Sequence, residues 1–354
     1  PSRHRVRAMP LPGPAPDPLL PPLALAAFLF TAAGVGALAN CAVVAALFKH
    51  HNTGLYSLIT QLALADTLMG VTLVPELWSS NSRTWRFGSK GCTAYQGLTV
   101  FTSTATLYLV MAIALHTIAT INFQRKASTR RFKKANDDEE IRSSSHSLVA
   151  NSDSSTPPRS MNIDYRIATK TIPTILPTVF VWTLSASLSV PEFVLSSTVY
   201  QKNGVVACTL DSDHRLNMHY MLAMFTSFLP LFIVTTCCAI IIVKLKSKKL
   251  FADIDNCELK SALKLSLWLI VVQVVFCAPR SFLSEYSVYS GSESDYNIMK
   301  VELPQWSNDI NTILSLSFSS ACLLTVLIRP LLYVVFLSRI RKIFGSSSEI
   351  GNNV

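Results

Sequence analysis

Charge is scarce in this sequence. Only 15% of its 354 residues are Asp, Glu, Lys or Arg, whereas 50% are hydrophobic, and the mean hydropathy is +0.37. Soluble domains carry about 25% charged residues, so this chain has too little polar surface to cover itself in water. The composition favours lipid as the solvent, and it argues against the two or three soluble domains that length alone suggests.

Motifs of enzyme and metal chemistry are also missing. The sequence contains no GxSxG, no HExxH and no glycine-rich phosphate-binding loop. Its eight cysteines form no CxxC pair, and its histidines do not cluster at ligand spacing, which argues against structural zinc. We therefore expect no enzymatic activity, no metal and no cofactor.

Long apolar runs take the place of these motifs. A bilayer core of about 30 Å requires about 20 apolar residues in a helix, and seven segments satisfy this. They are Leu19–Phe48, Leu55–Trp78, Gly91–Asn122, Ile167–Val190, Met218–Leu245, Leu259–Phe282 and Asn308–Phe336. The predicted fold is an all-α membrane protein with a seven-helix transmembrane domain over residues 19–336, preceded by an extracellular segment at 1–18.

Lys and Arg in the connections predict the orientation. With the N-terminus outside, roughly 20 basic residues lie on the inner side and roughly 10 on the outer side. The net charge of +10 then reflects topology and contact with anionic lipid, and it predicts no nucleic-acid partner. We expect a multi-pass protein of the plasma membrane.

Two inner segments differ from simple connections. Residues 124–166 pass from basic through acidic to Ser-rich sequence without an apolar face, and we expect them to be disordered. They are interpreted either as a phosphorylated regulatory loop or as an error in the gene model. Leu337–Phe344 mixes apolar and basic residues, which predicts a short amphipathic helix on the membrane surface before a cytoplasmic tail that ends at residue 354.

Characteristic residues occur in order along the seven segments. They are Asn40, the LALAD run at Leu62–Asp66, Trp85–Gly88 followed by Cys92, Trp182, Pro230, FCAP at Phe276–Pro279, and RPLLY at Arg329–Tyr333. This series resembles the rhodopsin-like (class A) G-protein-coupled receptors, in a divergent form. The run LTVFTSTATLYLVMAIAL resembles neuropeptide receptors of the vasopressin, corazonin and gonadotropin-releasing-hormone branch.

The resemblance implies a cell-surface receptor whose intracellular partner is a heterotrimeric G protein. Cys92 lies at the outer end of the third segment and Cys208 in the loop before the fifth. Since the outer side is oxidising, we expect a disulfide that holds this loop over the bundle. The alternative is two free buried thiols.

Asp66 is an ionisable residue in the middle of an apolar segment, where such residues usually face a partner. In the family the equivalent Asp binds sodium with the Asn of NPxxY, but Arg329 occupies that Asn position here. A buried arginine requires an anion, so we expect an Asp66–Arg329 ion pair in place of the sodium. Alternatively, Arg329 extends toward the cytoplasm. Asn40, Pro330 and Tyr333 occupy the neighbouring family positions.

Several trigger positions depart from the family pattern. His116, Thr117 and Ile118 replace Asp/Glu-Arg-Tyr at the inner end of the third segment, where the G protein docks. His116 is either a pH-sensitive group or an ordinary interfacial histidine. Cys277 replaces the usual Trp, whereas Pro279 still removes a backbone donor and predicts a kink. These changes put normal G-protein signalling in doubt.

The sequence lacks the residues with which receptors of this type bind amines and retinal, so these two ligand classes are disfavoured. Thr99 stands where amine receptors carry Asp, and Leu323 stands where opsins carry Lys. The candidate ligand-binding residues are Gln96, Thr99, Ser103, Arg280, Tyr286 and Trp306, with Glu76 nearby. Such a mixed set suits a peptide, with Arg280 as partner for a carboxylate or carbonyl; alternatively these side chains only pack and line a wet rim.

Three functions follow in order. The first is a receptor for a peptide or small extracellular ligand that transmits a conformational change to the cytoplasmic side. The second is a decoy or scavenger that binds ligand without coupling. The third is a transporter or channel, against which the few ionisable groups and the lack of paired broken helices argue.

Overall fold

A computed structural model describes residues 17–48, 54–146, 173–200, 206–210, 222–247, 257–286, 305–338 and 340–342. Side chains are described throughout these ranges except at 127–146, 200, 210, 257 and 305–309.

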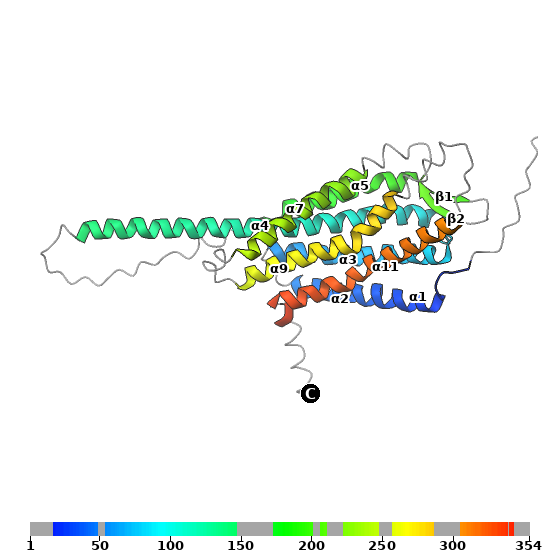
Figure 1. The fold of residues 1–354 in the computed structure, drawn as a ribbon, viewed down its shortest axis with the longest axis horizontal. Coiled ribbons are helices and arrows are strands. Elements are labelled where there is room, and N and C mark those ends of the chain that lie inside the picture. Colours follow the sequence, from blue (N-terminus) through cyan, green and yellow to red (C-terminus); the bar gives the residue numbers. More distant parts are fainter. Residues whose placement is uncertain are drawn as a thin grey trace, which may run out of the picture.

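The described residues contain seven helices that are long and apolar enough to cross a membrane. These spans are Pro22–Phe48, Gly54–Ser82, Gly88–Lys126, Ile175–Leu195, Met224–Lys246, Glu258–Tyr286 and Ile310–Phe336. The predicted seven-helix membrane bundle is therefore confirmed. Figure 1 shows the helices side by side along one long axis.

Some spans are built from more than one element. The first span comprises α1 (Pro22–Leu29), the π-helical η1 (Phe30–Val35) and α2 (Gly36–Phe48), and the next three are α3 (Gly54–Ser82), α4 (Gly88–His146) and α5 (Ile175–Leu195). The fifth span comprises η4 (Met224–Phe228) and α7 (Leu229–Lys246). The sixth includes α9 (Cys257–Val272) and η5 (Gln273–Cys277), and the seventh lies in α11 (Gln305–Phe336). The π-helical turn η5 ends two residues before Pro279, which lacks the N–H that a regular helix needs there.

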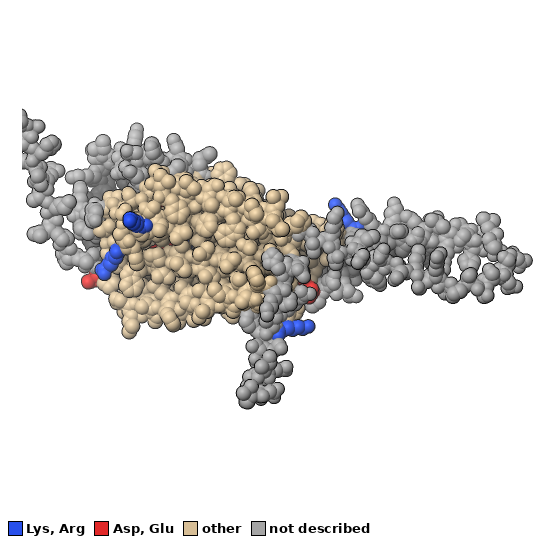
Figure 2. Space-filling view, turned by 180° about the vertical axis from the view of Figure 1, so that it is seen from behind, with Lys and Arg blue, Asp and Glu red and all other residues tan. Residues whose placement is uncertain are grey.

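The surface of the bundle suits a lipid environment. Figure 2 shows a broad middle region without Lys, Arg, Asp or Glu on the face in view, and the described charges lie toward the two ends. Many large apolar side chains point outward, including Phe30, Phe232 and Leu331. Ser and Thr on the spans bond mostly to their own helix, as Thr183 does to the Val179 carbonyl at 2.9 Å, so their polar groups are satisfied in lipid.

Close helix approach depends on small residues at two places. A Cβ added at Gly97 on α4 would lie 2.4 Å from the ring of Phe193 on α5. A Cβ added at Gly36 on α2 would lie 2.9 Å from the Val326 Cγ1 on α11. Because membrane helices associate through such packing rather than through exclusion of water, both glycines fix how closely their helices sit.

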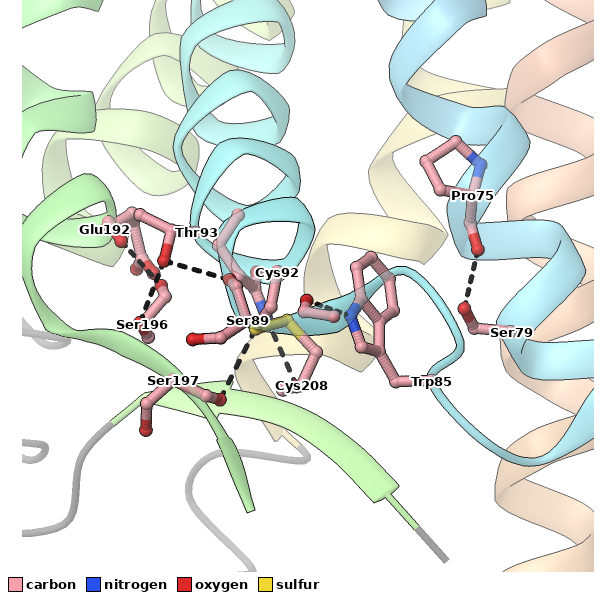
Figure 3. The surroundings of a disulfide bond; sticks show 12 residues. Pro75, Ser79, Trp85, Ser89, Cys92, Thr93, Glu192, Ser196, Ser197 and Cys208 are labelled. Atoms are coloured by element: carbon pink, nitrogen blue, oxygen red, sulfur yellow. Dashed lines mark hydrogen bonds between the residues drawn. A yellow bond between two sulfur atoms is a disulfide. The ribbon is translucent and has the colours of Figure 1, made fainter. Parts of the chain in front are cut away.

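A two-stranded hairpin covers the end of the bundle that was predicted to lie outside, here called the outer end. Strand β1 (Ser196–Tyr200) pairs antiparallel with β2 (Val206–Leu210), and Thr198 lies opposite Cys208. Cys92 at the start of α4 forms the predicted disulfide with Cys208. The Trp85 amide donates to the Val206 carbonyl at 2.7 Å, which holds the same strand from the loop before α4. Figure 3 shows the disulfide between the start of α4 and the hairpin.

The inner side differs from the prediction at α4. This helix continues to His146, and Figure 1 shows it extending beyond the other helices, although disorder was expected from residue 124. The segment 124–146 is rich in Lys and Arg, which are strong helix formers even where the sequence has no apolar face. Residues 147–166 lie outside the described residues, as do 167–172 of the predicted fourth span.

The chain turns helical again after the seventh span. Residues 338 and 340–342 are helical, and the Arg341 amide donates to the Leu337 carbonyl at 3.1 Å. Leu337 and Ile340 are buried, whereas Arg341 and Lys342 are exposed. One face therefore packs on the bundle and the other carries the basic residues, as expected for an amphipathic segment.

Candidate functional site

The inner half of the bundle contains a fully buried ion pair. Arg329 on α11 donates through Nη1 to the Asp66 carboxylate on α3 and through Nη2 to the Gln273 amide oxygen on η5. Both charged side chains are 0% exposed. The predicted pairing is thus present, and the guanidinium does not extend toward the cytoplasm. It ties the second, sixth and seventh spans together.

Several polar atoms around this pair have no partner among the described residues. They are the Asp66 Oδ2, the Arg329 Nε, the Tyr333 hydroxyl and the Asn40 Oδ1. Asn40 donates through Nδ2 to the Gly36 and Val326 carbonyls at 2.9 and 2.8 Å, which joins the first span to the seventh. Arg329 is followed directly by Pro330, which lies inside α11.

A second buried ion pair lies nearer the outer end. Arg280 on the sixth span donates through Nε to the Glu76 Oε1 at 2.9 Å and through Nη2 to Oε2. The Tyr95 hydroxyl donates to the Glu76 Oε2 at 2.9 Å, and the Ser319 hydroxyl donates to Oε1 at 2.5 Å. The bidentate guanidinium geometry is the strong form of a charge-assisted hydrogen bond. One carboxylate is therefore held by residues of the third, sixth and seventh spans.

Helix geometry explains how the two pairs are stacked. Asp66 and Glu76 lie ten residues apart on α3, which corresponds to about 15 Å along the helix. The sixth span presents Gln273, Cys277 and Arg280, which recur every three or four residues and so share one face. The seventh presents Ser319, Cys322, Thr325 and Arg329 in the same way. Two acids and two arginines cancel, so the buried network carries no net charge.

Hydroxyl groups link the third and sixth spans at the inner end. The Thr117 and Ser266 hydroxyls lie 3.0 Å apart, and Thr117 also donates to the Ile113 carbonyl at 2.8 Å. Thr117 is buried at 2% exposure and Ile118 at 9%. His116 lies beside Gly54, where an added Cβ would stand 2.8 Å from the imidazole. A neutral contact thus occupies the position where the family carries arginine.

The candidate ligand residues do not form one free cluster. Gln96 donates weakly to the Cys208 carbonyl at 3.5 Å, beneath the hairpin. The Thr99 hydroxyl has no partner among the described residues, whereas Ser103 donates to the Thr99 carbonyl at 2.7 Å. Tyr286 is 60% exposed at the end of the sixth span. Trp306 lies in α11, but its side chain is outside the described ones.

Sequence reasoning missed two features of this site. Glu76 and Arg280 were both recognised as polar residues near the outer mouth, but their pairing was not predicted. Cys322 was not singled out, yet its sulfur lies 2.8 Å from that of Cys277. Within the described part of the chain, no group of three or more His, Cys, Asp or Glu converges as a metal ion would require.

The geometry defines a multi-pass membrane protein with seven spans, a hairpin tethered by a disulfide, and polar links along the inner faces of the helices. Comparison with protein families is consistent with this. The model of the 7 transmembrane receptor (rhodopsin family) matches residues 39–131, from within α2 into the inner part of α4. Over these residues the chain is similar to the rhodopsin family of receptors. No curated protein matches it.

Proposed function

We propose that this chain is a plasma-membrane receptor with an extracellular N-terminus that binds a peptide at the hairpin end of the bundle. Ligand binding there alters the helix arrangement and transmits the change to the cytoplasmic side. The match to the rhodopsin-family model supports the receptor class, and the outer polar network supports the place and the mode of recognition.

The Glu76–Arg280 pair carries this proposal. A peptide carboxylate or carbonyl oxygen that accepts from Arg280 competes with Glu76 for the same donors. Because Glu76 also accepts from Tyr95 and Ser319, its release changes contacts of four spans at once. A ligand shifts a conformational equilibrium only through such a difference in contacts between two states.

The remaining candidate residues complete the proposed ligand site. Gln96, Thr99 and Ser103 share the face of α4 that leads inward from the hairpin, with the unpartnered Thr99 hydroxyl between the other two. Tyr286 and Trp306 lie at the outer ends of the sixth and seventh spans. This mixture of amide, hydroxyl and aromatic groups suits peptide backbone and side chains better than a compact charged ligand.

Thr117 favours a second candidate, a receptor that binds its ligand without activating a G protein. The hydroxyl contact between Thr117 and Ser266 provides no cationic group for a G protein to meet. His116 and Ile118 complete a sequence that differs from the family at three consecutive positions. A decoy or scavenging role accounts for these changes and retains the outer site.

The two candidates differ in one cellular measurement. The chain, with surface expression verified, is exposed to a panel of neuropeptides while G-protein activation is recorded. The same panel is applied to the double variant His116→Asp, Thr117→Arg. A response of the unaltered chain supports a signalling receptor, whereas a response of the double variant alone supports the decoy.

A matched pair of variants tests the ligand site. Arg280→Gln should reduce binding of an active peptide at least tenfold, because it removes the charged donor. Arg86→Gln removes an exposed arginine from the outer loop and serves as the control. If both variants bind as the unaltered chain does, Arg280 is not the recognition group. Ion flux without ligand would instead support a channel or transporter.

A further inference from the structure

Two thiols meet inside the bundle between the two ion pairs. Cys277 lies at the end of η5 on the sixth span and Cys322 lies on α11, and their sulfur atoms are 2.8 Å apart. A covalent S–S bond measures about 2.04 Å, so the sulfurs are within roughly 0.8 Å of bonding distance. Both side chains are buried, at 6% and 2% exposure.

The surrounding contacts keep the two sulfurs together. η5 packs against α11 along this stretch. Thr325 lies 3.9 Å from the Cys277 sulfur and donates to the Cys322 carbonyl at 2.7 Å. Arg280 follows one helical turn beyond Cys277, and Arg329 follows two turns beyond Cys322. Because each arginine is anchored to α3, the sixth and seventh spans cannot slide past each other without breaking an ion pair.

The other free cysteines whose side chains are described lack this geometry. Cys237 and Cys238 are adjacent on α7, where neighbouring side chains point in different directions. Cys41 is exposed on the first span. Among the free thiols in the described part of the chain, Cys277 and Cys322 are thus the pair whose sulfur atoms are close enough to form a bond between two spans.

We propose that Cys277 and Cys322 are oxidised to a second disulfide, which joins the sixth span to the seventh within the membrane. The oxidant is a protein disulfide of the secretory compartment. A deprotonated thiol of the pair attacks that disulfide and forms a mixed disulfide, and the second thiol then displaces the oxidant. Two electrons and two protons leave the pair, and the oxidant becomes a dithiol.

This chemistry requires no reagent that the chain does not already meet. The Cys92–Cys208 disulfide forms by oxidation in the same compartment. Since both inner thiols are buried in the finished bundle, the exchange takes place while the sixth and seventh spans assemble. The new bond restricts separation of the sixth span from the seventh at mid-membrane, independently of whether the chain couples to a G protein.

The test counts thiols in the full-length chain. Cells that express the chain are lysed directly into denaturant containing N-ethylmaleimide, without reductant, so that no thiol can oxidise afterwards. The sequence has eight cysteines, so a single disulfide leaves six labelled and two leave four. We expect four labels, together with a peptide pair that links Cys277 to Cys322 and separates on reduction.

Serine variants give the matched comparison. Cys277→Ser should give five labels, because Cys322 is released, and Cys322→Ser should give the same number. Cys237→Ser should give three labels and retain the linked peptides. Six labels on the unaltered chain, with both Cys277 and Cys322 modified, would overturn the proposal; this measurement on the unaltered chain does not require any variant to fold.

Discussion

Removal of one member of the Asp66–Arg329 pair leaves the other charge buried without its counter-ion. Both side chains are fully buried, and among the described residues the one further partner of Arg329 is the Gln273 amide. Loss of one partner of a buried ion pair typically destabilises a protein by about 3–5 kcal/mol. Simultaneous removal of both charges leaves no buried charge unpaired, and replacement of such a pair by well-packed apolar residues is often close to neutral.

The two single variants should differ in severity. Arg329→Asn leaves a carboxyl group that can take up a proton and become neutral. Asp66→Asn leaves a guanidinium that cannot lose its proton under any physiological condition. We therefore expect Asp66→Asn to be the more destabilising change, and the double variant to recover most of the loss.

Thermal unfolding of the purified chain in detergent measures this effect. A loss of 1 kcal/mol lowers the midpoint temperature by about 2–4 °C for a bundle of this size. The midpoint of each single variant should therefore be roughly 6–20 °C lower than that of the unaltered chain. Lys264→Gln removes an exposed charge from the sixth span and should change the midpoint little. Samples are heated at one common rate, because unfolding of such proteins is often irreversible.

The double variant decides the question. If its loss equals the sum of the single losses, the two residues act independently and the ion-pair reasoning is refuted. If Arg329→Asn is without effect, the guanidinium contributes nothing to the folded state. Recovery in the double variant, measured also as folded yield, is the outcome that the geometry predicts.

Three further predictions follow from other contacts. Replacement of the potassium in the buffer by sodium should leave the thermal midpoint of the unaltered chain unchanged. The midpoint of Arg329→Asn should instead depend on sodium, because the Asp66 carboxylate is then free to bind a cation. Cys208→Ser should lower stability by about 2–5 kcal/mol through loss of the disulfide and should reduce surface expression, unlike Cys41→Ser, which removes an exposed free thiol. Thr117→Val removes an inter-helix hydrogen bond worth about 1 kcal/mol and should raise amide exchange at the inner end of the sixth span, whereas Thr120→Val, whose hydroxyl bonds only to its own helix, should not.

The features predicted correctly from sequence are those that a single physical requirement fixes. The seven spans follow from segment length and composition, since lipid demands about 20 apolar residues in each helix. The Asp66–Arg329 pair follows because neither charge has water as an alternative partner at its depth. The Cys92–Cys208 disulfide followed from the position of both residues on the side that was predicted to be outside and oxidising, as the family resemblance implied.

The features that were missed depend on how helices are rotated and on where water is available. Glu76 and Arg280 both lie near the outer end, where water is an alternative partner, so sequence alone did not require them to pair. The contact of Cys277 with Cys322 depends on the rotational position of two helices, which periodicity does not fix. The length of α4 was missed because the segment has no apolar face, and the helix propensity of its Lys and Arg residues alone was not expected to order it.

The arrangement of the two ion pairs constrains how a signal could cross this bundle. Both acids lie on α3, whereas the sixth span supplies Arg280 and the seventh supplies Arg329, so these two spans are anchored to the second at different depths. A ligand that draws Arg280 from Glu76 frees the outer part of the sixth span but leaves the inner pair intact. Among the described residues, the sixth span then remains linked to that pair through the bond of Gln273 to Arg329. Movement of the inner half of the sixth span must therefore either break this bond or move Arg329 along with Gln273. Gln273 is thus the residue that couples the outer Glu76–Arg280 pair to the inner Asp66–Arg329 pair.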